Sequence, residues 1–230
     1  MTFANAVFTG TLVGAKTVQD ESGKDFVKGL LIIEEGKPGV ILEIYGKQIN
    51  EFLSLQNNPI VVVGSARLAP DSKQTGLKND LVVNVRQFAI ADGSINFLSI
   101  TGILGQNPEK KYVADGGKAI STFSLAVNTW PHKEASWFEL TAWERDAETI
   151  CKFCQKGHAL SIPFATAKIE EWEKNGETFK KWKFTAGKID LHSRKENEGT
   201  GGSHHQQRTV SQVVNAIAEK HGDNLDELPF

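Results

Sequence analysis

The feature that most constrains the fold of this chain is a pattern that occurs twice within residues 1–195. In each copy two short strand-like segments are followed by a helical stretch and then by an apolar run. The matching segments are Phe8–Leu12 with Ile100–Leu104, Leu42–Ile44 with Phe138–Leu140, and Ile60–Val63 with Ala159–Ile162. Repetition at this spacing predicts that one structural unit has been duplicated.

Each copy takes about 90–100 residues of short alternating strands, with one helix between the third and the fourth strand. This order is typical of a five-stranded, partly open Greek-key barrel, the OB-fold. We therefore predict a mainly β protein with two OB-fold barrels in tandem, residues 1–93 and 94–195. Two unrelated small β domains are the alternative interpretation.

The composition limits the class of protein. Hydrophobic residues make up 40% of the 230 residues, which is enough for a sizeable core, and the two cysteines cannot form a disulfide framework or a four-ligand zinc site. Apolar runs such as Ile60–Val63 are too short to span a bilayer, and the first residues have no basic start and no apolar stretch of signal-peptide length. We expect a cytoplasmic protein with no membrane segment.

Charge and tryptophan are unevenly distributed along the chain. Residues 94–195 carry fifteen Lys and Arg against twelve Asp and Glu, together with all five tryptophans, whereas residues 196–230 carry two against six. The segment from Glu196 to about Arg208 is rich in Gly, Ser, Gln and His, and residues 196–222 are expected to be a flexible linker in a disordered C-terminal tail. Apolar residues at helical spacing from Val210 to Ile217 indicate one possible short helix that ends near Gly222. An acidic segment, 223–230, follows. The sequence thus predicts a basic, aromatic centre and an acidic end.

Strand alternation assigns a face to most of the tryptophans, since successive side chains point to opposite sides. In 137–143 the apolar Phe138, Leu140 and Ala142 are expected in the core, which leaves Trp137 and Trp143 on the polar outer face. Trp130 points outward if the preceding strand keeps its phase. An outward patch of three indoles normally marks an interface, unless a loop or a neighbouring subunit covers it.

The last predicted hairpin differs. Trp182 alternates with Phe184 and Ala186 and is expected in the core, whereas Phe179 and the neighbouring lysines are expected on the outer face. Trp172 lies at the end of a predicted strand, just before the hairpin turn, and strand alternation does not decide on which face its side chain lies. Exposed indoles among lysines suit single-stranded nucleic acid, which offers bases for stacking and phosphates for cations.

Four segments of the second unit make it resemble the DNA-binding domain of the bacterial single-stranded-DNA-binding protein family: Thr101–Leu104, Phe123–Asn128, Trp137–Glu139 and Ala147–Ile150. Leu228–Phe230, preceded by acidic residues, resembles the C-terminal tip of that family. The resemblance implies that the chain wraps single-stranded DNA without sequence specificity. It also implies that Trp130, Trp137, Trp143 and Trp172 stack on bases.

The expected DNA-binding residues fall into two groups. The aromatic ones are Trp130, Trp137, Trp143, Trp172 and Phe179, and the cationic ones are Lys110, Lys111, Lys133, Arg145, Lys181 and Lys183. The expected partner-binding residues at the tip are Asp226, Glu227, Leu228, Pro229 and Phe230. The tip joins an aromatic ring and a carboxylate in one residue, which suits capture by a basic pocket. By resemblance, its partners are DNA replication, recombination and repair enzymes.

The resemblance also carries expectations about assembly. The family works with four barrels, so a two-barrel chain is expected to form a homodimer and to act at the nucleoid. The first barrel departs most from the family. At the positions that match Trp137 and Trp143 it has Ile41 and Lys47, and Tyr45 is its aromatic residue on that face. We expect this barrel to serve mainly in assembly. Residues 163–165 replace a turn usual in the family, which predicts a differently shaped edge.

Other chemistry finds little support in the sequence. Cys151 and Cys154 form a CxxC pair, but they lie on the apolar face of a predicted helix from about Asp146 to Gly157 and are expected to be small core residues. No nucleophile–base pair or phosphate-cradling loop is evident, so neither enzymatic activity nor a cofactor or metal is expected. The alternatives are an RNA-binding OB-fold protein, an adaptor that binds protein through its tryptophan face, and a CxxC metal or redox protein.

Overall fold

The structure, a computed structural model, describes residues 2–70, 77, 79–113, 117–129, 132, 134–174 and 176–191. The described residues belong to one compact unit of the chain, Met1–Arg194. The predicted linker, 196–222, and the predicted tip, 223–230, lie outside the described residues.

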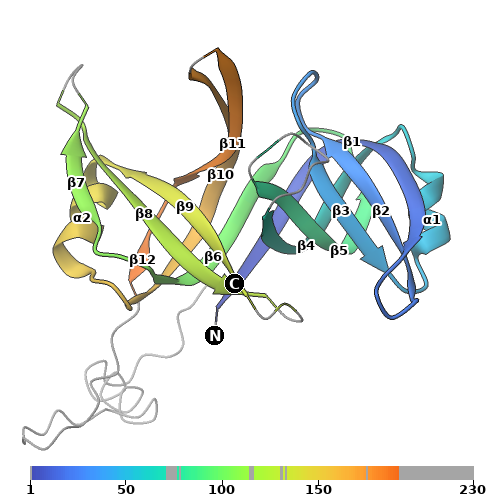
Figure 1. The fold of residues 1–230 in the computed structure, drawn as a ribbon, viewed down its shortest axis with the longest axis horizontal. Helices are drawn as coiled ribbons and strands as arrows, with labels where there is room; N and C mark the ends of the chain where they lie inside the picture. The colour runs from blue at the N-terminus through green and yellow to red at the C-terminus, as the bar shows by residue number, and fades with distance from the viewer. Residues whose placement is uncertain are drawn as a thin grey trace, which may run out of the picture. The chain divides into compact units, whose positions relative to one another are not determined.

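The first half of the chain forms a closed barrel (Figure 1). Its elements are β1 (Phe3–Gln19), β2 (Asp25–Ile32), β3 (Val40–Tyr45), α1 (Ile49–Ser54), β4 (Pro59–Pro70) and β5 (Asn79–Ile90). Strand pairing runs β1-β2-β3-β5-β4 and returns to β1, with β3 and β5 parallel and the other pairs antiparallel. The helix lies between the third and the fourth strand, as the sequence predicts.

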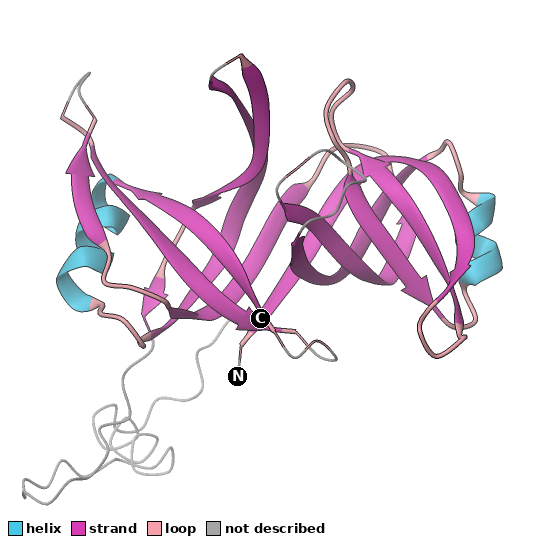
Figure 2. Ribbon diagram, viewed as in Figure 1, coloured by secondary structure: helices cyan, strands magenta, loops and turns pink. Residues whose placement is uncertain are grey.

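The second half repeats this circuit with two additions. Its elements are β6 (Asn96–Leu104), β7 (Glu109–Tyr112), β8 (Ala119–Asn128), β9 (Ala135–Trp143), α2 (Glu144–Phe153), β10 (Ala159–Lys174), β11 (Glu177–Ala186) and β12 (Asp190–Leu191). Pairing runs β6-β8-β9-β11-β10 and returns to β6, again with one parallel pair, β9 with β11. The short strands β7 and β12 pair with β8 and β10. Strands dominate both halves (Figure 2), which confirms the prediction of two OB-fold barrels.

Two neighbouring strands give the clearest account of the second core. Phe123 and Leu125 of β8 alternate with partly or fully exposed residues, and so do Phe138 and Leu140 of β9; all four are fully buried. The predicted phase is therefore confirmed for both strands. Thr141 is the exception on the outer face of β9: it is buried at the position where β9 pairs with Thr185 of β11.

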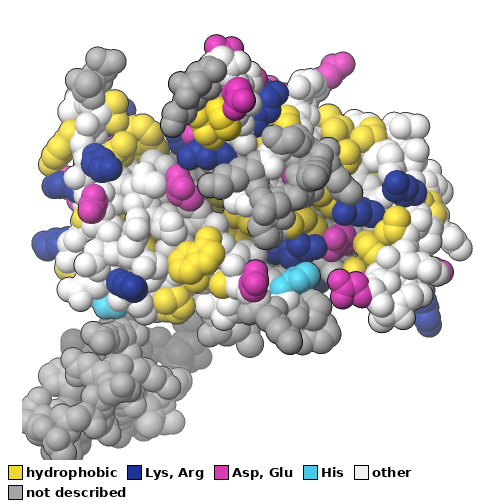
Figure 3. Space-filling view, in the orientation of Figure 1, with side chains coloured by type: hydrophobic (Ala, Val, Ile, Leu, Met, Phe, Trp, Pro, Cys, Tyr) yellow, Lys and Arg dark blue, Asp and Glu magenta, His cyan; other side chains and the backbone are white. Residues whose placement is uncertain are grey.

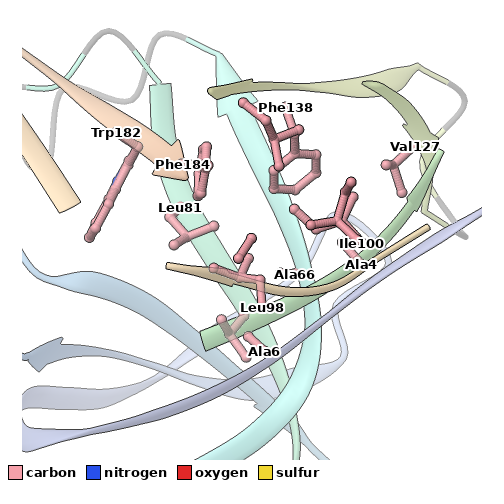
Figure 4. Packing of buried hydrophobic residues seen from close by; sticks show 14 of the residues in the cluster. Ala4, Ala6, Ala66, Leu81, Leu98, Ile100, Val127, Phe138, Trp182 and Phe184 are labelled. Carbon is pink, nitrogen blue, oxygen red and sulfur yellow. The ribbon is translucent and has the colours of Figure 1, made fainter. Parts of the chain in front are cut away.

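Trp182 is buried, as predicted, with 8% of its surface exposed. Its neighbours include side chains of the first barrel: Figure 4 shows Trp182 and Phe184 of β11 close to Leu81 of β5, and these two strands are in contact. A buried indole of this size therefore packs into a core that both barrels share.

The two barrels are also joined by backbone pairing. The N-terminal part of β1 pairs with β4 on one side and with β6 on the other, from Phe3 opposite Thr101 to Phe8 opposite Asn96. At the other end of the junction, the N–H of Leu68 donates to the Ser136 hydroxyl at 3.2 Å. The described strands thus form a continuous twelve-stranded sheet.

The predicted edge at residues 163–165 shows a local irregularity. The register of β10 against β6 shifts between Ile162 and Ala165. Pro163 has no N–H to donate to the ladder, and prolines inside sheets are typically found at such bulges. The bulge leaves the Phe164 ring exposed and in contact with Phe97, with ring centroids 5.3 Å apart.

Both cysteines of the CxxC pair lie in or directly after helix α2. It begins at Glu144 and ends at Phe153, slightly earlier at both ends than predicted. Cys154 is buried and Cys151 half-buried, both as free thiols, and burial raises the pKa of the Cys154 thiol. Within the described part of the chain, no three His, Cys, Asp or Glu side chains are grouped to hold a metal, and no helix has the length and apolar content to cross a membrane.

Candidate nucleic-acid interface

The outer face of β9 carries two exposed indoles. Trp137 is 54% exposed and Trp143 is 41% exposed, while the residues between them on the inner face are buried. Six residues of strand place the two rings about 20 Å apart along β9. Exposed apolar side chains lie among charged ones on the face shown in Figure 3. Trp137 and Trp143 thus form one aromatic surface on β9, with both rings open to planar ligands.

Gly105, just after β6, positions the first of these indoles. Its N–H donates to the carbonyl of Ser124 at 3.0 Å, which holds the backbone of Gly105 beside β8. A Cβ at this position would meet Cζ3 and Cη2 of the Trp137 ring. Glycine therefore leaves the space in which the ring rests. The role of Gly105 could not be predicted from the sequence, since nothing local to it points to a tryptophan 32 positions away.

A second aromatic surface lies on the β10–β11 hairpin, which extends beyond the barrel (Figure 1). Trp172 and Phe179 are cross-strand partners, 39% and 38% exposed, with ring centroids 5.8 Å apart and planes at 20°. The ammonium of Lys181 lies 5.7 Å from the centroid of the Trp172 ring. The sequence did not decide on which face of its strand Trp172 lies. The structure places it on the exposed face, together with Phe179.

Between the two aromatic surfaces runs a chain of four charged side chains. Lys181 Nζ lies 3.3 Å from Glu139 Oε1 of β9 and 3.8 Å from Glu170 Oε2 of β10. Lys183 Nζ lies 2.8 Å from Glu170 Oε1. The hydrogen bond from Lys183 lowers the pKa of the Glu170 carboxyl. Lys181 and Lys183, which were expected from the sequence to be available to phosphate, are therefore ion-paired within the protein.

Two hollows adjoin β9, one lined by Glu139 and the other by Trp137. One, of about 410 Å³, lies over β7, β8 and β9 and is lined by Gln106, Asn107, Glu109, Lys111, Thr122, Ser124 and Glu139. The other, of about 550 Å³, is lined by Arg67, Leu68, Asn79, His132, Glu134, Ala135, Ser136 and Trp137. The amides and hydroxyls of the first hollow, from Gln106, Asn107, Thr122 and Ser124, were not among the site residues expected from the sequence.

Comparisons with known proteins agree with this geometry. The profile of the single-strand binding protein family matches residues 95–192. Single-stranded DNA-binding protein 1 of Synechocystis is 32% identical over 83 residues, which cover 35% of this chain and 67% of that protein. The chain belongs to the single-strand binding protein family.

The other matches differ in how much of each chain they cover. Single-stranded DNA-binding protein A of Bacillus subtilis is 33% identical over 73 residues, which cover 30% of this chain and 42% of that protein. The wild-type single-stranded DNA binding protein of Thermus aquaticus has a TM-score of 0.63 at 17% identity, covering 88% of this chain and 97% of that one. At that identity the likeness establishes the fold, and it extends over both barrels.

The structure brings together some of the residues expected at a family binding face and separates others. Trp137, Trp143, Trp172, Phe179, Lys181 and Lys183 lie on outer strand faces of the second barrel and its hairpin. Lys111 pairs with Ile120, opposite Trp143, and lines the polar hollow on that same side. Trp130 and Lys133 lie outside the described residues.

Lys110 and Arg145 lie elsewhere. Lys110 alternates with Lys111 and so points to the other face of β7, where its ammonium lies 5.3 Å from the Tyr112 ring centroid. Its hydrogen bond with the Tyr112 side chain raises the pKa of Lys110. Arg145, on α2, lines a shallow hollow together with Tyr112. Lys110 therefore lies on the face of β7 opposite to Lys111, and Arg145 lies beside Tyr112 at the start of α2.

The corresponding face of the first barrel is more closed. Ile41 is buried, and Tyr45 is half-buried against Phe26, with ring centroids 4.8 Å apart and planes at 11°. Burial raises the pKa of the Tyr45 hydroxyl. Arg67 forms a largely buried ion pair with Glu43 at 2.9 Å. No exposed indole lies among the described residues of this barrel.

Proposed function

We propose that this chain binds single-stranded DNA without sequence specificity through the second barrel. The main support for this proposal is the pair of exposed indoles on the outer face of β9. The stacked rings of Trp172 and Phe179 on the β10–β11 hairpin add a second aromatic surface. Every base has a π-face, so stacking on these rings tolerates any sequence. Duplex DNA keeps its bases stacked on one another and offers them no such contact.

Phosphate contacts supply the second part of the binding free energy. Lys111, Lys181 and Lys183 lie on the same side as the indoles, and cations near a phosphate backbone release counter-ions when DNA binds. Binding through both terms predicts protection of unwound DNA and a loss of affinity as salt rises. The names of the matched relatives, which state single-stranded DNA binding, support this proposal.

Titration with dT oligomers of increasing length, followed by indole fluorescence at two salt concentrations, tests the proposal. We expect quenching that saturates and an affinity that falls with salt. Parallel titration with rU oligomers separates DNA binding from RNA binding, because the 2′-hydroxyl distinguishes the two. An adaptor that binds protein through its tryptophan face would show no salt-dependent binding to either oligomer, and that result would refute the proposal.

We further propose that the acidic tip recruits DNA replication, recombination and repair enzymes. The residues concerned, Asp226, Glu227, Leu228, Pro229 and Phe230, lie outside the described residues, so the support is the sequence alone. Deleting residues 223–230 should leave the affinity for dT oligomers largely intact and abolish binding to purified enzymes of this class. A tip-deleted protein that still bound those enzymes would refute this role.

A homodimer with four barrels, acting in the cytoplasm at the nucleoid, completes the proposal. The supporting surface is an apolar row across the barrel junction: Val63 of β4 pairs with Val7 of β1, which pairs with Phe97 of β6, and Phe97 contacts the exposed Phe164. Half of this row belongs to the first barrel, which supports its role in assembly. Phe164→Glu should shift the protein to monomer in sedimentation, whereas Phe153→Glu, at an exposed site on α2, should not.

A further inference from the structure

Two of the cations expected to contact DNA phosphates already have anionic partners within the protein. Lys181 lies between the carboxylates of Glu139 and Glu170, and Lys183 donates to Glu170 at 2.8 Å. The four side chains come from β9, β10 and β11 and alternate in sign, so their net charge is zero. A phosphate approaching this part of the face meets neutralised lysines.

The carboxylates lie where a bound strand would pass. Glu139 is on the outer face of β9 between the two exposed indoles, and its side chain is 59% exposed. Glu170 shares its face of β10 with Trp172, two residues away, by strand alternation. A strand crossing from Trp137 or Trp143 to Trp172 therefore passes over both glutamates.

We infer that Glu139 and Glu170 are built-in counter-ions that compete with DNA phosphates for Lys181 and Lys183. A phosphate gains a lysine by displacing a carboxylate, so the exchange releases fewer bound salt ions than capture by a free lysine. The displaced carboxylates then repel the phosphates nearby. The affinity is held below the value that the lysines alone would give, and its salt dependence is shallower. The inference rests on the proposed DNA binding.

The chain provides a matched control on the same strand. Glu171 also pairs with a lysine, Lys180, at 3.3 Å, and it is comparably accessible to solvent. It lies next to Glu170 and therefore points to the opposite face of β10. Glu171→Gln removes the same charge and the same kind of ion pair without changing the face that carries Trp172.

The experiment measures binding of a dye-labelled dT oligomer to the full chain and to Glu139→Gln, Glu170→Gln, the double variant and Glu171→Gln. At about 50 mM salt each single variant on the aromatic face should bind about fivefold tighter, the effect of one unit charge at contact distance in water. The slope of log affinity against log salt should steepen by up to about 1.4 in the double variant, since each released lysine adds about 0.7. Glu171→Gln should match the wild type closely.

At about 1 M salt all variants should converge on the wild type, because screening removes the competition. Melting curves check that each variant is folded. If the wild type binds and the two glutamate variants bind equally well or more weakly with an unchanged slope, the carboxylates orient the lysines and do not compete with DNA, and the inference alone is refuted. If the wild type fails to bind the oligomer, the proposed function is refuted as well.

Discussion

Replacing the exposed indoles of β9 by alanine gives the sharpest quantitative test of stacking. A tryptophan side chain offers up to about 250 Å², and a stacked base covers roughly half of what is exposed. For Trp137, which is 54% exposed, this amounts to about 70 Å², and at about 25 cal/mol per Å² to about 1.7 kcal/mol. For Trp143, which is 41% exposed, the same reasoning gives about 1.3 kcal/mol.

These free energies predict losses of affinity of about 15- to 20-fold for Trp137→Ala and about tenfold for Trp143→Ala. The assay is anisotropy of a dye-labelled dT oligomer, because the variants lose part of the intrinsic fluorescence signal. Phe153→Ala, at an exposed aromatic site on α2, is the control and should bind normally. Binding of both tryptophan variants within about twofold of the wild type, or an equal loss of affinity in the control, would show that these indoles do not stack on bases.

Three further predictions follow from single positions. Gly105→Ala should displace the Trp137 ring and weaken dT binding several-fold with little change in melting temperature, since a flexible side chain yields; unchanged binding would contradict the positioning role. Phe184→Ala should lower the free energy of unfolding in urea by about 3–5 kcal/mol, and a loss below about 1 kcal/mol would place the ring outside the core. Glu170 has a lowered pKa from its hydrogen bond with Lys183, so its stabilising contribution exists above the ordinary carboxyl pKa and is lost as pH falls through the lowered value. The difference in melting temperature between wild type and Glu170→Gln should shrink as the pH falls below the ordinary carboxyl pKa of about 4.3; a difference that stays constant as the pH is lowered into the acid range would contradict this.

The sequence was a good guide wherever the deciding information is local. Strand alternation depends on backbone geometry, so the outward placement of Trp137 and the burial of Phe138 could be predicted from a seven-residue segment. The duplicated order of strands and helix likewise predicted two barrels. Trp172 stayed open because it lies at the end of its strand, where the phase is least certain, and its partner across the hairpin assigned it to the exposed face.

The sequence was a poorer guide where the deciding neighbour is distant. Lys110 and Lys111 were grouped by their charge, but the pairing of β7 with β8 sends them to opposite faces. The partners of Lys181 come from β9 and β10, so its engagement with carboxylates required the arrangement of three strands. A lysine's availability to phosphate depends on what lies within about 4 Å of it, which no run of consecutive residues specifies.

Local periodicity and duplication were therefore enough to determine the class of fold and the side of β9 on which Trp137 and Trp143 lie, because both follow from the fixed geometry of an extended backbone. Only the tertiary structure decided that Gly105 makes room for Trp137, that Trp182 packs against the first barrel, and that β1 joins β6. Each of these depends on which distant strands become neighbours, and that choice is made by burial summed over the whole chain.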